Sequence, residues 1–197
     1  MSVAGTQSYA GADVPNLVAA AVELAVELGF SSSCRVEQGQ LLMALAAGAS
    51  GVIGETGTGC GVGLAWLVSG RRPGARIVSI ERDAERAERV RQLFHGVDDV
   101  EIVTGDWSAI VEHAPFDLLV LDGGGSLTDG SDVDPSLLLH PGGTVVNDDF
   151  TPITQWPPVH AGAVDAERLA WLTHPGLLAA ELRLAPDLST IVATRRP

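Results

Sequence analysis

The chain has 197 residues, of which 46% are hydrophobic and 19% charged, so it suits one globular domain and excludes a disordered or collagen-like protein. Its 12 basic residues are all arginine and its formal net charge is −13, which argues against nucleic acid or a membrane as a partner. The lack of lysine excludes Schiff-base chemistry and a lysine general base. Two cysteines without CxxC spacing, and no signal-peptide pattern, predict a cytoplasmic protein.

Residues 1–48 precede the main pattern of the chain. Residues 1–13 are small and polar and predict a loose tail, followed by helices over 14–28 and from about 36 to 47. We expect this tail and these helices to complete a single domain whose core is 49–197. The helical first 48 residues could also pair two subunits into a homodimer.

After Gly48, short apolar runs alternate with helical patterns. Strands are expected at 51–54, 75–80, 100–104, 116–121 and 144–146, and helices at 62–68, 84–94, 132–139 and 164–172. The runs 178–184 and 190–194 predict an antiparallel hairpin. Together these units predict a three-layer α/β sandwich, with a doubly wound, mostly parallel, seven-stranded Rossmann-like sheet that ends in the hairpin.

A glycine-rich turn between the first expected strand and its helix is the sharpest motif. Gly57, Gly59 and Gly63 allow close approach of a ligand, but their spacing is not the G-x-G-x-x-G of dinucleotide-binding proteins. Glu55 would face a pyrophosphate unfavourably, whereas its carboxylate suits an ammonium or a sulfonium. The turn therefore predicts a pocket for a positively charged ligand at the carboxyl ends of the strands.

The next two strand ends carry groups suited to an adenosine. Glu81 could accept both ribose hydroxyls, and Arg82 could cover the adenine edge. Asp106 could accept from the adenine amino group, and the backbone N–H of Trp107 could reach a ring nitrogen. The alternatives are that Glu81 is an exposed strand-end charge and that Trp107 packs in the core.

Carboxylates also end the fourth and fifth strands. Asp122, Asp148 and Asp149 would converge beside the glycine turn, and oxygen ligands of this kind suit a divalent cation such as Mg²⁺. The alternative is that Asp148 and Asp149 cap a loop and only Asp122 touches the ligand.

From about Ser33 to the C-terminus, this order of motifs resembles class I S-adenosylmethionine-dependent methyltransferases, and most closely the small catechol and caffeoyl-CoA O-methyltransferase-like family. The resemblance implies S-adenosylmethionine as the methyl donor. It assigns the residues named above to the methionine part, the ribose, the adenine and the metal, and it makes residues 36–40 the helix start that leads into the cofactor site. The last metal position, here Asp149, is usually Asn in the family.

The chain departs from the family after its fourth strand. The family follows the aspartate there with a second acid and a lysine, whereas Asp122 is followed by three glycines. The expected activity is O-methylation of a small catechol- or phenol-like acceptor, in which Asp122 and Asp148 are catalytic by holding a metal that deprotonates the acceptor. Without a metal, a carboxylate or histidine must serve. His140 is near in sequence, but we expect it at the far end of the fifth strand, and His160 could face an acceptor.

Two other functions remain open at this point. The missing lysine and the glycines after Asp122 are compatible with a methyltransferase-fold protein that binds S-adenosylmethionine, or its product, without turnover. A nucleotide-binding oxidoreductase is disfavoured by the glycine spacing and by Glu55.

Overall fold

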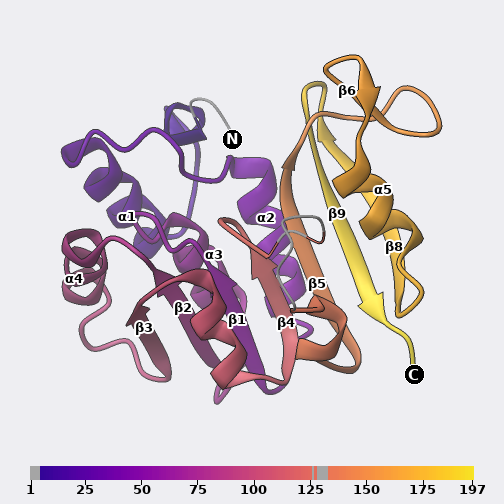
Figure 1. The fold of residues 1–197 in the computed structure, drawn as a ribbon. Helices are drawn as coiled ribbons and strands as arrows, with labels where there is room; N and C mark the ends of the chain where they lie inside the picture. Colours follow the sequence, from indigo (N-terminus) through magenta and orange to yellow (C-terminus); the bar gives the residue numbers. More distant parts are fainter. Residues whose placement is uncertain (1–4, 126, 128–132) are drawn as a thin grey trace.

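A central sheet organises the molecule, for which a computed structural model describes residues 5–125, 127 and 133–197, without the side chain of Asp149. Its strands are β1 (Val52–Thr56), β2 (Arg76–Glu81), β3 (Val100–Thr104), β4 (Phe116–Leu121), β5 (Leu139–Phe150), β8 (Leu177–Ala185) and β9 (Leu188–Arg195). They lie in the order β3-β2-β1-β4-β5-β9-β8 (Figure 1). The first five are parallel, β9 is antiparallel to β5, and β8 is antiparallel to β9. The predicted seven-stranded sheet with a terminal hairpin is confirmed.

Helices cover both faces of the sheet because each central strand is apolar on both sides. They are α1 (Asn16–Glu27), α2 (Val36–Ala46), α3 (Val62–Gly70), α4 (Ala84–Leu93), α5 (Ala166–Thr173) and the 3₁₀ helices η1 (Gly5–Tyr9), η2 (Trp107–His113) and η3 (Pro135–Leu138). Ile53 and Ile77 share a buried core with α1, α2 and α3, whereas Val78 and Ile80 share the other core with η2 and α5. A short hairpin of β6 (Val159–His160) and β7 (Ala163–Val164) follows β5.

The N-terminal segment differs from its prediction. Residues 1–13 were expected to form a loose tail, but Gly5–Tyr9 is a 3₁₀ helix whose Tyr9 is 8% exposed. The Tyr9 hydroxyl donates to the Cys34 carbonyl (3.0 Å) and accepts from Trp66 Nε1 (2.9 Å). Gly5 lies so close to the Ser33 carbonyl oxygen that a Cβ would be 1.6 Å from it. Small residues allow this close packing, and composition does not reveal it.

Two further elements differ in length. The predicted helix over 132–139 starts outside the described residues, and within them only the 3₁₀ turn Pro135–Leu138 forms. The fifth strand extends over Leu139–Phe150 rather than 144–146, since it pairs with both β4 and β9.

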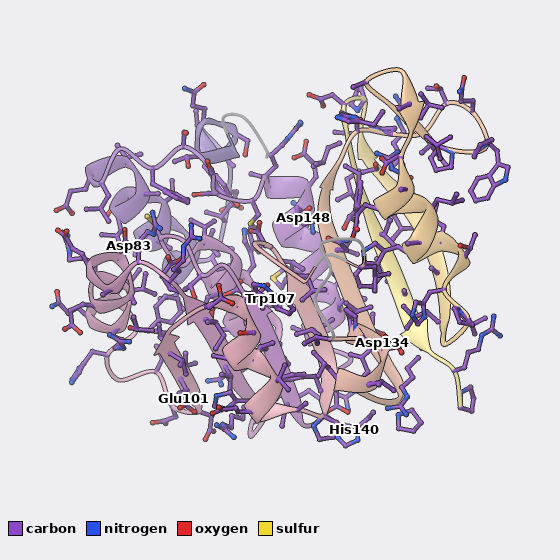
Figure 2. All side chains as sticks on the ribbon, in the orientation of Figure 1. Asp83, Glu101, Trp107, Asp134, His140 and Asp148 are labelled. Carbon is purple, nitrogen blue, oxygen red and sulfur yellow. The ribbon has the colours of Figure 1, made fainter. Side chains whose placement is uncertain are left out.

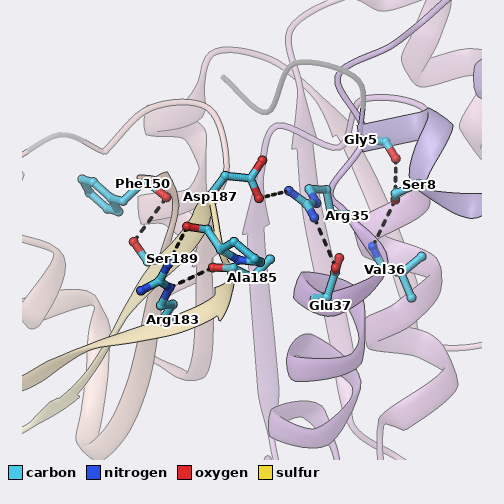
Figure 3. Close-up of polar contacts among 11 residues, drawn as sticks. Gly5, Ser8, Arg35, Val36, Glu37, Phe150, Arg183, Ala185, Asp187 and Ser189 are labelled. Atoms are coloured by element: carbon cyan, nitrogen blue, oxygen red, sulfur yellow. Dashed lines mark hydrogen bonds and ion pairs between the residues drawn. The ribbon is translucent and has the colours of Figure 1, made fainter. Parts of the chain in front are cut away.

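Polar contacts join the N-terminal region to the end of the sheet. The Arg35 guanidinium lies 2.8 Å from Asp187, in the turn between β8 and β9, and 3.2 Å from Glu37 (Figure 3). At the start of α2 the Ser8 hydroxyl accepts from the Val36 amide (3.3 Å). These contacts fix the segment that leads into α2.

Among the helices of the described residues, none has the length and apolar character needed to cross a bilayer.

Candidate functional site

A pocket of about 500 Å³ lies where the parallel strands end. Its walls come from the turns after four neighbouring strands and from the loop after α1. The lining residues are Gly57 and Gly59 after β1; Ile80, Glu81, Arg82 and Arg86 from β2 to α4; Gly105, Asp106 and Trp107 after β3; Asp122, Gly123 and Gly124 after β4; and Phe30 and Ser32. Connections from β1 and β4 leave in opposite directions here, which is where doubly wound sheets bind ligands.

The glycine turn owes its shape to close backbone contacts. Gly57 has φ of 82°, and a Cβ on it would be 1.6 Å from the Asp122 carbonyl oxygen. The Gly59 amide, at φ of 56°, donates to Glu81 Oε2 (2.8 Å). A side chain is therefore excluded at Gly57, and the Gly59 amide holds the acid at the end of β2.

Glu81 is buried at the pocket wall, with 4% of its surface exposed, so it is not an exposed strand-end charge. Its Oε1 accepts from the Asp83 amide (2.8 Å) and from Arg86 Nη2 (2.9 Å). A carboxylate has about four acceptor positions, and these contacts and the Gly59 amide use three of them. One position on Oε2 is left for a ligand hydroxyl.

Arg86 and Phe30 form one wall of the same pocket. The Arg86 guanidinium lies over the Phe30 ring, 5.0 Å from its centroid, while it pairs with Glu81. Neither residue was predicted. Arg86 stands in the first turn of α4, whose N-cap is Asp83, so its place three residues after the cap was a usable signal. Phe30 and Ser32 come from a loop whose sequence carries no such signal.

Asp106 and Trp107 line the pocket after β3, and their contacts with an adenine stay a prediction. Asp106 caps η2 and accepts from the Ser108 amide (3.2 Å). The Trp107 side chain also packs against the buried core, as the alternative interpretation expected. A Cβ on Gly124 would be 2.4 Å from the Trp107 ring, which explains why a glycine follows β4 at this point.

Glu55 and Gly63 lie beneath the glycine turn and not on the pocket wall. Glu55 is 2% exposed, and its Oε2 accepts a short hydrogen bond from the Ser79 hydroxyl. A Cβ on Gly63 would be 2.6 Å from Glu55 Oε1, so this glycine leaves room for the carboxylate. Burial, reinforced by the charge of Glu81, raises the pKa of Glu55 to about 8, although the Ser79 hydrogen bond opposes the shift.

Asp122 and Asp148 follow paired residues of neighbouring strands, since Leu121 pairs with Asn147. Both acids lie near Cys34. The pKa of the Cys34 thiol is raised mainly by its burial and further by the negative charges of these two acids. Asp148 and Trp107 occupy the same edge of the sheet, and His140 lies at the opposite end as predicted (Figure 2).

A complete metal site is not formed by the residues described. Among them, no three or more His, Cys, Asp or Glu residues form a group that could hold a metal ion. The side chain of the third predicted ligand, Asp149, lies outside the described part of the chain.

Comparisons with known proteins give a match to one family model and a shared fold. Residues 55–150 match a family model described as a methyltransferase domain. No sequence among curated proteins matches the chain.

Three solved structures share the fold over nearly their full length. Cofactor-bound Rv0187 from MTB has a TM-score of 0.77 and 24% identity, over 96% of this chain and 94% of that one. The O-methyltransferase from Bacillus cereus in complex with SAH has a TM-score of 0.74 and 19% identity, over 97% of this chain and 96% of that one. The third is the O-methyltransferase TomG from Streptomyces achromogenes, which is involved in tomaymycin synthesis and was solved with SAM. It has a TM-score of 0.75 and 21% identity, over 100% of this chain and 96% of that one.

Proposed function

We propose that the chain, whose residues 55–150 match a methyltransferase-domain model, is a class I S-adenosylmethionine-dependent methyltransferase. It transfers the methyl group of S-adenosylmethionine to a hydroxyl oxygen of a small acceptor. A catechol or a phenol is the acceptor class we favour. Two of the similar structures are O-methyltransferases solved with SAH or SAM, which supports oxygen as the acceptor atom and S-adenosylmethionine as the donor.

The single observation that carries the proposal is the position of Glu81. A buried carboxylate with one open acceptor position lies on the wall of a 500 Å³ pocket, between the glycine turn and the Asp106–Trp107 wall. An adenosine ribose placed there would donate to Glu81 while its base lies against Trp107. Calorimetry with SAH and with NADH tests this arrangement against a site for a nicotinamide cofactor. We expect SAH to bind and NADH not to bind.

Methyl transfer depends mainly on how the donor and the acceptor are positioned, and protein side chains take little direct part in the bond changes. The acceptor oxygen forms a bond to the methyl carbon as the carbon–sulfur bond breaks, and the sulfonium leaves as the neutral thioether of SAH. The acceptor hydroxyl must also lose its proton. We assign this proton to Asp148, which is 9% exposed and lies at the strand end beside Asp122.

The test of this assignment is Asp148→Asn, which keeps the shape of the side chain and removes its basicity. We expect kcat on a catechol to fall at least tenfold while SAH affinity changes less than twofold. Equal kcat in the variant would remove Asp148 from the proton transfer.

A divalent cation such as Mg²⁺ is the finer part of the proposal. Asp122 and Asp148 are the two described carboxylates that would hold it, and the cation would lower the pKa of a bound acceptor hydroxyl. Loss of activity in EDTA, restored by Mg²⁺, supports the cation. Full activity in EDTA removes it and leaves the Asp148 route.

A second candidate function is binding of the cofactor without turnover. It is favoured by Gly123 and Gly124, which occupy the pocket wall where the related family carries an acid and a lysine. In that case SAH binds to the wild type, and no methylated product forms across a catechol and phenol panel, with or without Mg²⁺.

A further inference from the structure

A second pocket, of about 320 Å³, lies where the parallel strands begin. Its wall is formed by the last turn of α2, the residues just before β1 and the first parts of β4 and β5. One lining residue, Pro141, follows His140, which lies at the end of the sheet opposite Asp148 (Figure 2). This pocket shares no lining residue with the pocket of the candidate functional site, so the two are separate.

Asp117, the second residue of β4, is the one charged residue among those that line this pocket. Its Oδ2 accepts from the Val52 amide (3.0 Å), and a Cβ on Gly51 would be 2.4 Å from this same oxygen. The glycine before β1 therefore leaves the room that the carboxylate needs. Asp117 Oδ1 has no hydrogen-bond partner among the described residues. A carboxylate held at one oxygen and open at the other thus lines the pocket.

The end of α2 adds to the negative potential of this pocket. The helix ends at Ala46, and the carbonyl end of a helix carries a partial negative charge. Its last turn has no basic residue to offset that charge. Arg72 donates to the Ala47 carbonyl (2.9 Å) beyond the helix end, but it does not line the pocket. The Ser50 and Thr144 hydroxyls supply further acceptors, and neither hydroxyl has a partner within the described part of the chain.

We propose that this pocket binds a small free organic amine through its ammonium group. The ammonium pairs with Asp117 Oδ1 and has two further N–H donors for the hydroxyls of Ser50 and Thr144. The aliphatic part of the amine lies against Leu45 and Leu118, which also line the pocket. A volume of about 320 Å³ is at the lower end of the range for small-molecule sites, so the ligand has a short chain.

The charge and the donor set of the pocket argue against other classes of ligand. An anion would meet Asp117 and the negative end of α2, and a neutral molecule would gain nothing from either. A divalent metal ion takes several oxygen ligands, whereas this wall supplies one carboxylate. The residues that the structure describes also hold no group of three or more His, Cys, Asp or Glu suited to a metal ion.

The test uses hexylamine as the probe and hexan-1-ol, which has the same chain and no charge, as the comparison. In calorimetry we expect saturable binding of hexylamine and at least tenfold weaker binding of hexan-1-ol. Asp117→Asn should weaken hexylamine binding at least tenfold, because the amide oxygen can still accept from Val52 but carries no charge. Ala44→Leu is the second variant, since it narrows the pocket from an exposed position of α2 where leucine favours the helix. It should weaken hexylamine binding at least fivefold.

Two matched controls separate the pocket from general attraction to an acidic protein. Asp13→Asn removes the same charge from an exposed residue elsewhere, and Ala19→Leu repeats the other exchange at an exposed position of α1. Both should leave hexylamine binding unchanged. Absence of hexylamine binding to the wild type, an unchanged affinity in the folded Asp117 variant, or an equal loss in the Asp13 control would overturn the proposal.

Two further measurements complete the experiment. Tighter binding of Nα-acetyl-lysine methylamide than of hexylamine would overturn the choice of a free amine in favour of a lysine side chain of a partner protein. Thermal unfolding of each variant without ligand shows that the comparison is made on folded protein. SAH binding measured on the same samples reports on the other pocket, so a failure of the proposed function is recognised separately.

Discussion

Proton release on cofactor binding is the most direct consequence of the buried Glu55. Its pKa of about 8 means that the side chain is mostly protonated at pH 7 in the free protein. A ligand ammonium nearby stabilises the charged form and should displace that proton. With a pKa of about 8, binding at pH 7 should release up to about 0.9 of a proton.

The assay is calorimetry of SAH binding in buffers that differ in ionisation enthalpy. The slope of the observed enthalpy against the buffer enthalpy gives the number of protons released. SAH affinity should also weaken as pH falls below 8, by up to tenfold, or about 1.4 kcal/mol, for each pH unit. In Glu55→Gln both effects should vanish, because the amide has no proton to release. Binding of SAH to the wild type with no proton release at pH 7 would refute the reasoning.

The same group gives a test on the free protein. Its pKa is raised from the ordinary value of 4.5 to about 8 in the folded state, so the folded state binds the proton more tightly than the unfolded chain does. The contribution of this group to stability is therefore complete below pH 4.5 and is lost as pH rises to about 8, with a slope of up to about 1.4 kcal/mol per pH unit. Urea unfolding of Glu55→Gln should show a flatter pH dependence than the wild type across this window.

Three other predictions concern the pocket and its support. Glu81→Ala should weaken SAH binding by about 1–3 kcal/mol in calorimetry, since buried polar partners lose their acceptor; an unchanged affinity would remove the ribose assignment. Gly57→Ala should lower both the stability in urea and the SAH affinity, because the added Cβ would meet the Asp122 carbonyl oxygen. Gly74 has the same φ of 82° but open space around it, so Gly74→Ala should lower stability only through backbone strain. Tyr9→Phe should lower the free energy of unfolding by about 1–3 kcal/mol because a tryptophan N–H loses its buried acceptor, and an equal urea midpoint would contradict this.

The fold was predictable because its signals are repeated along the chain. Five apolar strand runs, each followed by a helix or a turn, and a final hairpin leave few alternatives to a doubly wound sheet. The N-terminal 3₁₀ helix was not predictable, because it depends on contacts with residues far along the chain. Tyr9 is held by Cys34 and Trp66, and Gly5 fits against Ser33. No local pattern encodes these contacts.

Some residues of the candidate site were predictable from the sequence and others were not, for the same reason. Glu81, Asp106 and Trp107 were predictable because a strand end fixes where the next side chain lies. Glu55 was predicted to face a positively charged ligand, but it lies beneath the turn, at a depth that depends on Ser79 and Gly63. Periodicity along one strand cannot give that depth, because it is set by packing between elements.

Glu81, Asp106 and Glu55 are each held in a different way. Glu81 is neutralised by Arg86, and Asp106 is held by a backbone amide at the start of η2. Glu55 has no basic residue among its hydrogen-bond and electrostatic partners within the described part of the chain, so in the free protein its charge is suppressed by burial. A cationic ligand is the partner that would restore that charge. We therefore expect Glu55 to give the site a preference for an ammonium or a sulfonium. Exchanging this carboxyl group for an amide should remove the preference while the adenosine contacts remain.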